Sequence, residues 1–268
     1  MITLRFDPLQ IFKTSKTPIG LYARANWLDE GCGCVWQGDS SETVAYLTAR
    51  QAPDGSWGQS PAETIRSLHT LYLAASEKTE NVGQALEWLI KNTLTHLLPE
   101  ALDEELRPES FRELPFIKAH DPLTRVCATL YLACMFGLEN KEAIPEHYEI
   151  IIRWLEDHEE RNDIAADKSN ILRALAVHRV YAEDAAVIRL VAELGECQKT
   201  SGLWPAPTPF FLTLNTLARL NCEMAHRQWL KAVPLLETTQ KKDGSWGLHD
   251  REWNTFLVVD ALKNKNCL

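Results

Sequence analysis

The chain has 268 residues, 45% of them hydrophobic, which is enough for a large buried core. Its net charge of −9 argues against nucleic acid as a partner, because that partner requires a basic surface. No apolar run of about 18 residues occurs, and residues 1–16 lack the apolar core of a signal peptide, which predicts a cytoplasmic protein. The seven cysteines, mostly at apolar helical positions, are expected to be reduced, buried thiols.

The first predicted helix covers residues 18–28. Thr17 is its expected N-cap, and Pro18 occupies the first helical position. This helix resembles the second helix of each repeat unit described next.

Three copies of one pattern follow along the chain. Each has a glutamine, a glycine four positions later and a tryptophan six positions later: Gln51–Trp57, Gln198–Trp204 and Gln240–Trp246. Apolar residues at helical spacing precede each glutamine, and a second helix follows each tryptophan, with Thr64, Thr213 or Thr255 near its start. The glycine fits a turn that requires a positive φ. The repeat unit is therefore a helix, a Gly-Trp turn and a second helix.

Two further helix pairs without the Gly-Trp turn are predicted in the middle of the chain. Residues 82–98 lead through a long loop to 124–136, and residues 144–158 lead to 170–181. Together the units give six inner-type helices, which we expect to form a single domain over residues 1–268. These helices are expected near residues 18–28, 62–75, 122–136, 169–181, 211–221 and 254–264.

The sequence Gln-x-x-Asp-Gly-Ser-Trp-Gly between two helices resembles the repeat of the squalene-hopene cyclase superfamily, which shares its fold with protein prenyltransferase β subunits. The resemblance covers residues 42–264 and rests on three copies in one register. It implies an all-α fold, an (α/α)6 toroid of helical hairpins around an apolar lumen. It also implies that this lumen binds an apolar, isoprenoid-type small molecule.

Class II terpenoid cyclases of that superfamily protonate an alkene with an Asp-x-Asp-Asp motif just before an inner helix. That string is absent from this chain, as is the Asp-Asp-x-x-Asp of class I terpene synthases. Asp121, next to His120, occupies the slot nearest the family's acid, and the pair is our candidate for a catalytic acid and its modulator. The alternative is that Asp121-Pro122 is an N-cap followed by a first-turn proline, and that Ser60 to Glu63 form a capping box.

Prenyltransferase β subunits instead bind Zn²⁺ through an Asp-x-Cys motif and a histidine one repeat later. Residues 30–36 resemble this only loosely, because Glu30 replaces the aspartate and Glu63 stands where a histidine would be needed. Cys32 and Cys34 therefore fit a glycine-bent loop as well as a zinc site. We predict no metal and no cofactor.

The aromatic residues divide between scaffold and ligand site. Trp57, Trp204 and Trp246 belong to the turns and are expected to be structural. Ring faces on the inner helices could stabilise a carbocation, although aromatic residues at helical spacing are also common in cores. The candidate substrate-binding residues are Tyr72, Tyr131, Phe211, Trp253 and Phe256.

The sequence thus predicts an atypical terpenoid cyclase or isomerase. A non-catalytic lipid-binding or interaction toroid is the alternative, and a zinc-dependent prenyltransferase β-like subunit ranks third. Residues 99–120, acidic and then apolar, fit either a lid over the lumen or a short helix on its rim. Peripheral membrane contact and the oligomeric state stay open.

Overall fold

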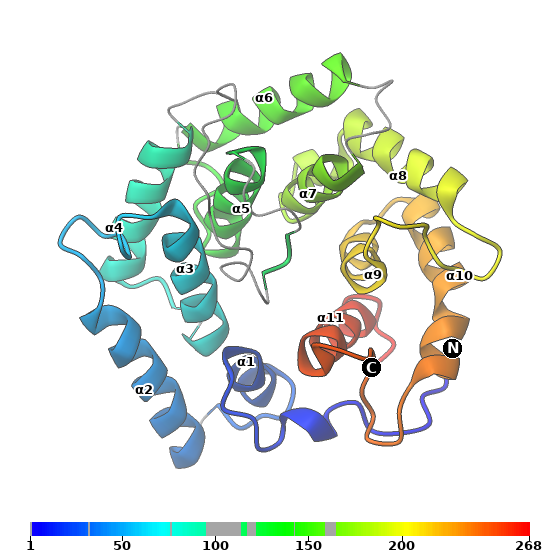
Figure 1. Ribbon diagram of the computed structural model, residues 1–268, viewed down its shortest axis with the longest axis horizontal. Coiled ribbons are helices and arrows are strands. Elements are labelled where there is room, and N and C mark those ends of the chain that lie inside the picture. The colour runs from blue at the N-terminus through cyan, green and yellow to red at the C-terminus, as the bar shows by residue number, and fades with distance from the viewer. Residues whose placement is uncertain are drawn as a thin grey trace. The chain divides into compact units, whose positions relative to one another are not determined.

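The computed structural model describes residues 2–31, 33–75, 77–94, 114–116, 122–141, 143–158 and 165–268. These residues contain eleven α-helices and no strand, as the all-α prediction requires. The helices are α1 (Pro18–Asn26), α2 (Cys34–Ala49), α3 (Pro61–Ala75), α4 (Glu80–Leu89), α5 (Pro122–Met135), α6 (Ala143–Asp157), α7 (Ala165–Ala176), α8 (Ala185–Cys197), α9 (Phe210–Arg219), α10 (Glu223–Thr239) and α11 (Arg251–Asn264) (Figure 1). Short turns of other helix types are η1 (Gln10–Phe12), η2 (Ile90–Leu94) and η4 (Tyr181–Glu183).

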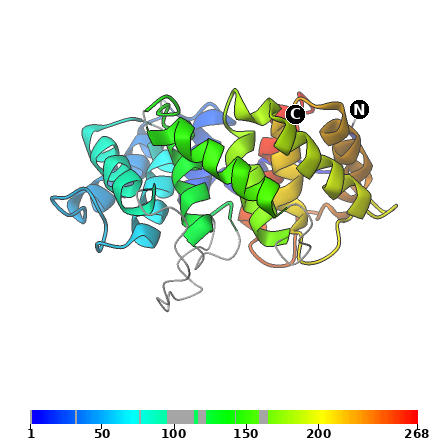
Figure 2. The same cartoon turned by 90° about the horizontal axis from the view of Figure 1, so that it is seen from above.

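The helices group into two compact units. The first unit combines Met1–Asp39 with Arg179–Leu268, and the second is Ser40–His178. In the first unit α9 packs against both α10 and α11, and α11 also packs against α1 (Figures 1 and 2). In the second unit α5 packs against α3 and α7. That all six inner-type helices form one domain over residues 1–268 stays a prediction.

Each of the six predicted inner-type helices is present, as α1, α3, α5, α7, α9 and α11. Thr17 caps α1 as expected, its hydroxyl accepting a hydrogen bond from the Gly20 N–H at 3.0 Å. Only α7 is displaced, because it covers Ala165–Ala176 where residues 169–181 were predicted. The two alanines that begin α7 are strong helix formers, and the helix ends in a turn where the His178 N–H bonds to the Leu175 carbonyl.

The three glutamines of the repeat make the same pair of hydrogen bonds. In each copy the amide nitrogen donates to the carbonyl of the turn glycine, at 2.8 Å for Gln51, 3.0 Å for Gln198 and 3.2 Å for Gln240. It also donates to a main-chain carbonyl of a neighbouring segment. Gln51 donates to Asn81, Gln198 to Gln228, and Gln240 to Phe6. The glutamine therefore closes its own turn and fastens that turn to its neighbour.

The turn glycines are required for two reasons. Gly55, Gly202 and Gly244 have φ of +92°, +89° and +83°, a region that strains any residue with a side chain. A Cβ on each would also lie 2.7 Å, 2.3 Å or 2.1 Å from a backbone atom of the neighbouring segment. Each of the three copies therefore has glycine four positions after glutamine because the turn passes close to the backbone of a neighbouring segment at that point.

The three tryptophans are buried, as the scaffold interpretation requires. In the first and third copies the indole N–H donates to a carbonyl of the preceding helix, Trp57 to Leu47 at 2.9 Å and Trp246 to Leu236 at 2.8 Å. Their main-chain N–H groups donate to the hydroxyls of Thr64 and Thr255, which fixes the start of the next helix.

The second copy differs from the other two. The Trp204 indole nitrogen and the Thr213 hydroxyl are both buried, and neither has a hydrogen-bond partner among the described residues. The connection between them contains three prolines, Pro205, Pro207 and Pro209, which have no N–H to donate.

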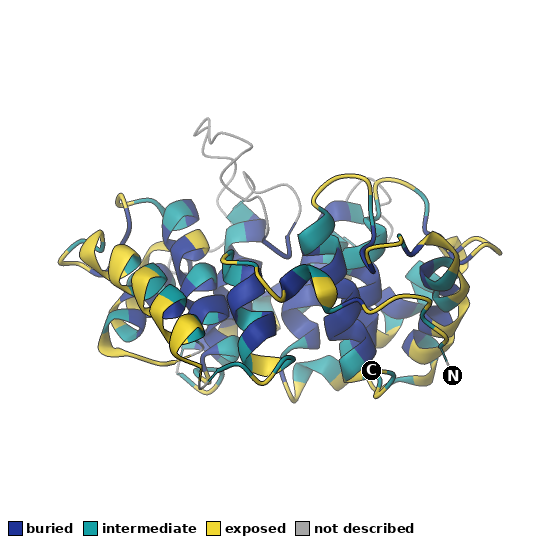
Figure 3. Cartoon of the chain, turned by 90° about the horizontal axis from the view of Figure 1, so that it is seen from below, coloured by how far each residue is buried: buried dark blue, intermediate teal, exposed yellow. Residues whose placement is uncertain are grey.

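Burial separates two kinds of helix, as the blue and yellow segments of Figure 3 show. Residues of α5 and α11 are buried on most sides, whereas Ser40 is the only buried residue of α2. This contrast fits inner helices surrounded by neighbours and outer helices that face solvent. In the described part of the chain, no helix combines the length and the apolar character needed to cross a membrane.

Candidate functional site

An aromatic group in the first unit joins α1 to α11. Phe256 stacks on Trp27 with ring centroids 5.1 Å apart, and on Trp253 at 5.6 Å with nearly parallel planes. The ring of Tyr22 meets both Trp27 and Phe256 edge-on, at 5.7 Å and 5.5 Å. Phe12 of η1 completes the group with an edge contact to Trp27 at 5.7 Å. We call these five residues the aromatic group.

Helical spacing explains why the two α11 rings lie together. Residues three apart on an α-helix lie on adjoining parts of one face, so Trp253 and Phe256 both project toward the region next to α1. Several offset and edge-on contacts in one place present ring faces and ring edges at once. Such a group suits an apolar ligand, and its ring faces can stabilise a positive charge.

A polar group lies further along the same part of the first unit. Asp260 on α11 forms an ion pair with Arg219 on α9, with Oδ2 and Nη2 2.7 Å apart. The same Oδ2 accepts hydrogen bonds from Asn215 at 2.8 Å and from Asn264 at 3.2 Å. Asn215 also donates to the Leu257 carbonyl at 3.1 Å, which fixes α9 against α11. We call Asn215, Arg219, Asp260 and Asn264 the polar group.

Of the five candidate substrate-binding residues, Trp253 and Phe256 stack on each other in the first unit. Phe211 begins α9 in the same unit and contacts Phe210, with ring centroids 5.3 Å apart. The other two candidates belong to the second unit: Tyr72 meets the ring of Phe136, and Tyr131 meets that of Phe116. Their role in binding stays a prediction.

The candidate acid pair, Asp121 and His120, lies outside the described residues, as does most of the 99–120 segment. Within that segment, residues 114–116 are described, and both Leu114 and Phe116 are buried. The alternative of an N-cap at Asp121 is therefore as open as the catalytic interpretation.

The other acidic residues at the starts of inner helices differ in their surroundings. Glu63 in α3 is half-exposed, and its main-chain N–H donates to the Ser60 hydroxyl at 3.4 Å, which is one of the two bonds of a capping box. The second bond is not formed, because the Ser60 N–H donates to the Trp57 carbonyl. Glu252 in α11 accepts a hydrogen bond from the Thr17 hydroxyl at 2.9 Å, which links α11 to α1. Asp167, in the first turn of α7, is buried. Each thus has a structural setting of its own.

The segment proposed as a loose zinc motif is only partly described. Cys32 lies outside the described residues, and Cys34 begins α2 with its side chain exposed. Among the residues that the structure describes, no three or more histidines, cysteines or carboxylates lie close enough together to hold a metal ion.

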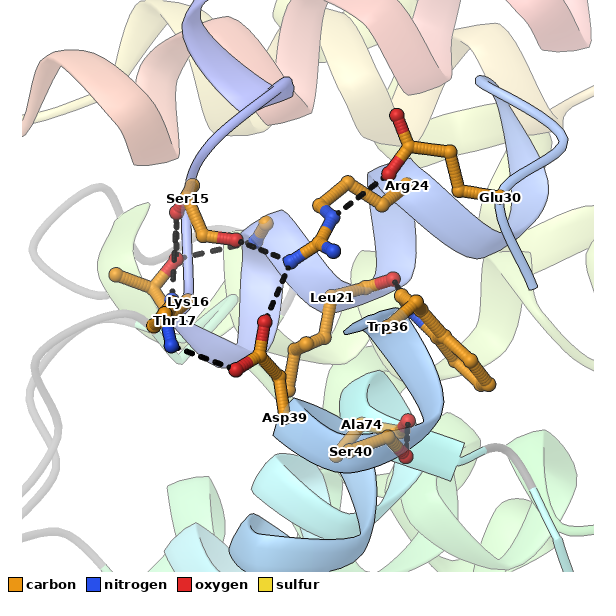
Figure 4. A network of polar contacts seen from close by, with 11 residues as sticks. Ser15, Lys16, Thr17, Leu21, Arg24, Glu30, Trp36, Asp39, Ser40 and Ala74 are labelled. Carbon is orange, nitrogen blue, oxygen red and sulfur yellow. Dashed lines mark hydrogen bonds and ion pairs between the residues drawn. The ribbon is translucent and has the colours of Figure 1, made fainter. Parts of the chain in front are cut away.

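A network of charged side chains connects α1 to the start of α2 (Figure 4). The buried Arg24 guanidinium donates to Asp39 at 2.9 Å and to Glu30 at 3.0 Å. Lys16 donates to the other oxygen of Asp39 at 2.8 Å. The hydrogen bond from Lys16, and after it the one from Arg24, lowers the pKa of the Asp39 carboxyl. Since each charge has a partner, the network is a structural link between helices.

Two side chains of the second unit, His69 and Cys134, stay uncharged at physiological pH because burial shifts their pKa values. Burial lowers the pKa of His69 on α3 to about 4, so its ring is neutral at physiological pH. Burial also raises the pKa of Cys134 to about 12, which keeps its thiol protonated next to the Tyr148 hydroxyl at 3.0 Å. A protonated thiol is a poor nucleophile, so Cys134 does not mark an active site.

The candidates predicted from the sequence did not include Tyr22 and Trp27, which belong to the aromatic group. They did not include Asp260 or its partners either. One signal was present in the sequence: Trp253, Phe256 and Asp260 follow one another at spacings of three and four, which puts two rings and a carboxylate on one helix face. The partners on α1 and α9 have no such signal, because they lie far away in the chain.

Comparisons with known proteins find likeness in structure only. No family model matches the chain, and no curated protein matches it either. A single-residue variant of the type II terpene cyclase MstE from Scytonema, solved with the substrate geranylgeranyl dihydroxybenzoate, is similar with a TM-score of 0.58 and 15% identity, over 94% of this chain and 87% of that one. A variant of MstE with its product merosterolic acid A gives a TM-score of 0.55 and 17% identity over the same shares.

The crystal structure of a protein from Actinoplanes is similar over 99% of this chain and 92% of that chain, with a TM-score of 0.55 and 16% identity. At such identities the likeness shows the fold alone. The chain therefore has the all-helical α/α toroid fold of type II terpene cyclases, as the repeat pattern predicted.

Proposed function

We propose that this protein binds an apolar, isoprenoid-type small molecule and acts on it as an atypical terpenoid cyclase or isomerase. The observation that carries the proposal is the stacking of Phe256 on both Trp27 and Trp253, in a fold shared with a cyclase solved with a geranylgeranyl compound. The rings offer an apolar surface to the hydrocarbon chain and a negative ring face to a carbocation.

The proposed reaction begins with transfer of a proton to a carbon–carbon double bond. The two π electrons form the new C–H bond, and the adjacent carbon becomes cationic. Asp121 is the proposed donor and His120 the proposed modulator of its acidity, because they occupy the slot before α5. Loss of a proton from a neighbouring carbon then restores a double bond, which gives an isomer. In a cyclisation, the π electrons of a second double bond in the same molecule first attack the cation and form the ring C–C bond, and the resulting cation then loses the proton. Neither route needs a cofactor.

The ligand would be recognised mainly by burial of its apolar surface. Each buried CH₂ contributes about 0.8 kcal/mol, so an isoprenoid chain gains affinity from length without any charged contact. The aromatic group supplies rigid surface for this, since its five rings already hold one another in place.

Turnover is tested by incubating the protein with a panel of polyprenyl diphosphates and squalene, and detecting hydrocarbons or alcohols by mass spectrometry. New product that disappears in Asp121→Asn would support the proposal, since asparagine cannot donate a carboxyl proton. Product that persists in Asp121→Asn would contradict the assigned acid. Glu196→Gln, on the exposed side of α8, is the matched control for loss of a single carboxylate.

Binding is tested separately with Phe256→Leu. We expect weaker polyprenyl binding in this variant than in Trp154→Leu, because Trp154 of α6 stacks on His158, just past the end of that helix, instead of belonging to the aromatic group. Tight binding with no turnover would favour the non-catalytic alternative. Stoichiometric zinc in the purified protein would favour the prenyltransferase-like alternative.

A further inference from the structure

Among the residues that the structure describes, Asp260 finds partners for only one of its two carboxylate oxygens. Oδ2 takes the ion pair with Arg219 and the hydrogen bonds from Asn215 and Asn264. Oδ1 accepts no hydrogen bond from any described residue, and it is not among the fully enclosed polar atoms without a partner. The contacts between α9 and α11 therefore use Oδ2 alone, and Oδ1 is available to accept a hydrogen bond from a ligand.

The position of Asp260 on α11 follows from its neighbours on that helix. Phe256 and Glu252 mark the side that meets α1, through the ring contacts and the Thr17 hydroxyl. Leu257 marks the side that meets α9, through its bond to Asn215. At about 100° per residue, Trp253 and Asp260 lie within about 20° of each other, in the sector between these two sides. Asp260 thus shares a helix face with the aromatic group, about 10 Å further along the axis.

The charges around Asp260 determine which end group fits there. Asp260 and Arg219 neutralise each other, so the polar group offers no net attraction to an anion. The cation at the end of α11, Lys265, donates to the Leu220 carbonyl at 3.0 Å, and burial lowers its pKa. A diphosphate brought next to Asp260 would meet a carboxylate oxygen, whereas a hydroxyl could donate to it.

We propose that Asp260 receives, on Oδ1, the hydroxyl of an isoprenoid alcohol whose hydrocarbon chain lies along Trp253 and Phe256. The inference rests on the proposed function for the isoprenoid nature of the ligand, and it adds the end group that the site selects. The aromatic group binds the chain, and the polar group fixes the hydroxyl and with it the position of each double bond along α11.

The test compares three probes that differ only at one end: geranylgeraniol, its methyl ether and geranylgeranyl diphosphate. Binding is followed by quenching of tryptophan fluorescence, since Trp27 and Trp253 belong to the site. A hydrogen bond to a charged acceptor contributes about 1.5 kcal/mol or more, so the wild-type protein should bind the alcohol about tenfold more tightly than the ether. The diphosphate should bind more weakly than the alcohol.

Two variants assign the preference to the polar group. In Asp260→Asn the preference for alcohol over ether should fall to about threefold or less, and binding of the diphosphate should improve because Arg219 loses its counter-charge. Arg219→Gln keeps the carboxylate, so it should retain the preference for alcohol over ether and weaken diphosphate binding further. Glu196→Gln should change none of these ratios.

Equal binding of alcohol and ether by the wild-type protein would overturn the inference, as would a preference that Asp260→Asn leaves unchanged. If Asp260→Asn does not fold, Arg219→Gln still tests the inference. Tighter binding of the diphosphate than of the alcohol by Arg219→Gln would also overturn it. The proposed function fails differently, through absence of product from every substrate in the panel, because discrimination between alcohol and ether requires no turnover.

Discussion

Gln240 and Phe6, 234 positions apart, exchange a pair of hydrogen bonds. The Gln240 amide nitrogen donates to the Phe6 carbonyl at 2.9 Å, and its Oε1 accepts from the Phe6 N–H at 3.1 Å and from the Arg5 N–H at 3.0 Å. The corresponding amides of Gln51 and Gln198 bond to the segment that follows them in the chain. For Gln240 the N-terminal segment takes that place.

Replacing Gln240 with alanine should release the N-terminal segment. The substitution removes two accepted and two donated hydrogen bonds in a buried setting, so we expect unfolding to be easier by about 1–3 kcal/mol. Hydrogen exchange at Arg5 and Phe6 should become faster. Gln198→Ala is the matched control, because it removes the same side chain from another turn and should leave exchange at Phe6 unchanged. Unaltered exchange in Gln240→Ala would refute this account of closure.

Much of this arrangement could be predicted from the sequence, and the limit has a physical basis. The register of glutamine, glycine and tryptophan identified the turns, since each residue type answers one local requirement of φ, hydrogen bonding or burial. The helix pairs followed from apolar spacing. What the register could not provide is which segment each turn contacts: nothing local in residues 240–246 specifies Phe6 as the partner.

The candidate site, too, could be predicted from the sequence only in part. Trp253 and Phe256 were predicted because one helix carries both. The pairing of Asp260 with Asn215 and Arg219 depends on how α9 packs against α11, a long-range property that spacing within one helix does not contain. The prediction for α7 was wrong by a few residues because its start has neither a Gly-Trp turn nor a proline at the first helical position, such as Pro122 in α5, to mark it.

Replacing the repeat tryptophans with phenylalanine should separate the second copy from the others. All three variants lose similar ring volume, but Trp57→Phe and Trp246→Phe also lose an indole hydrogen bond to a carbonyl of the preceding helix. Trp204 has no such bond among the described residues. We therefore expect Trp204→Phe to be less destabilising by about 1 kcal/mol, measured by urea unfolding. Equal losses in the three variants would show that the bond contributes little.

Alanine at Gly244 should be among the most damaging small substitutions. Its Cβ would lie 2.1 Å from the Asp7 carbonyl oxygen, at a φ of +83° that already strains a residue with a side chain. Either the turn or the N-terminal segment must move, so we expect a loss well above 1 kcal/mol in the free energy of unfolding.

Gly38→Ala is the matched control for Gly244→Ala. Gly38 lies within α2, and a Cβ there would meet nothing within 4 Å. Because alanine is the better helix former, this variant should be more stable than the wild type by about 0.5–1 kcal/mol. Thermal unfolding of both variants measures the contrast, and comparable stability of the two would mean that the turn tolerates a side chain after all.

The buried His69 should make the protein less stable as the pH falls from about 6.5 to about 4. Its pKa is lowered from 6.5 to about 4 in the folded state, so the unfolded chain takes up a proton first and is favoured over this range. The contribution is fully present above pH 6.5, and about 3 kcal/mol of it is lost by pH 4.

In His69→Gln this part of the pH dependence should disappear, whereas His226→Gln, exposed on α10, should keep it. Urea unfolding at pH 7 and pH 4.5 gives the comparison, in which other titrating groups cancel between wild type and variant. Identical pH slopes for the wild type and His69→Gln would mean that His69 can take up a proton without unfolding, and that its environment is more polar than its burial indicates.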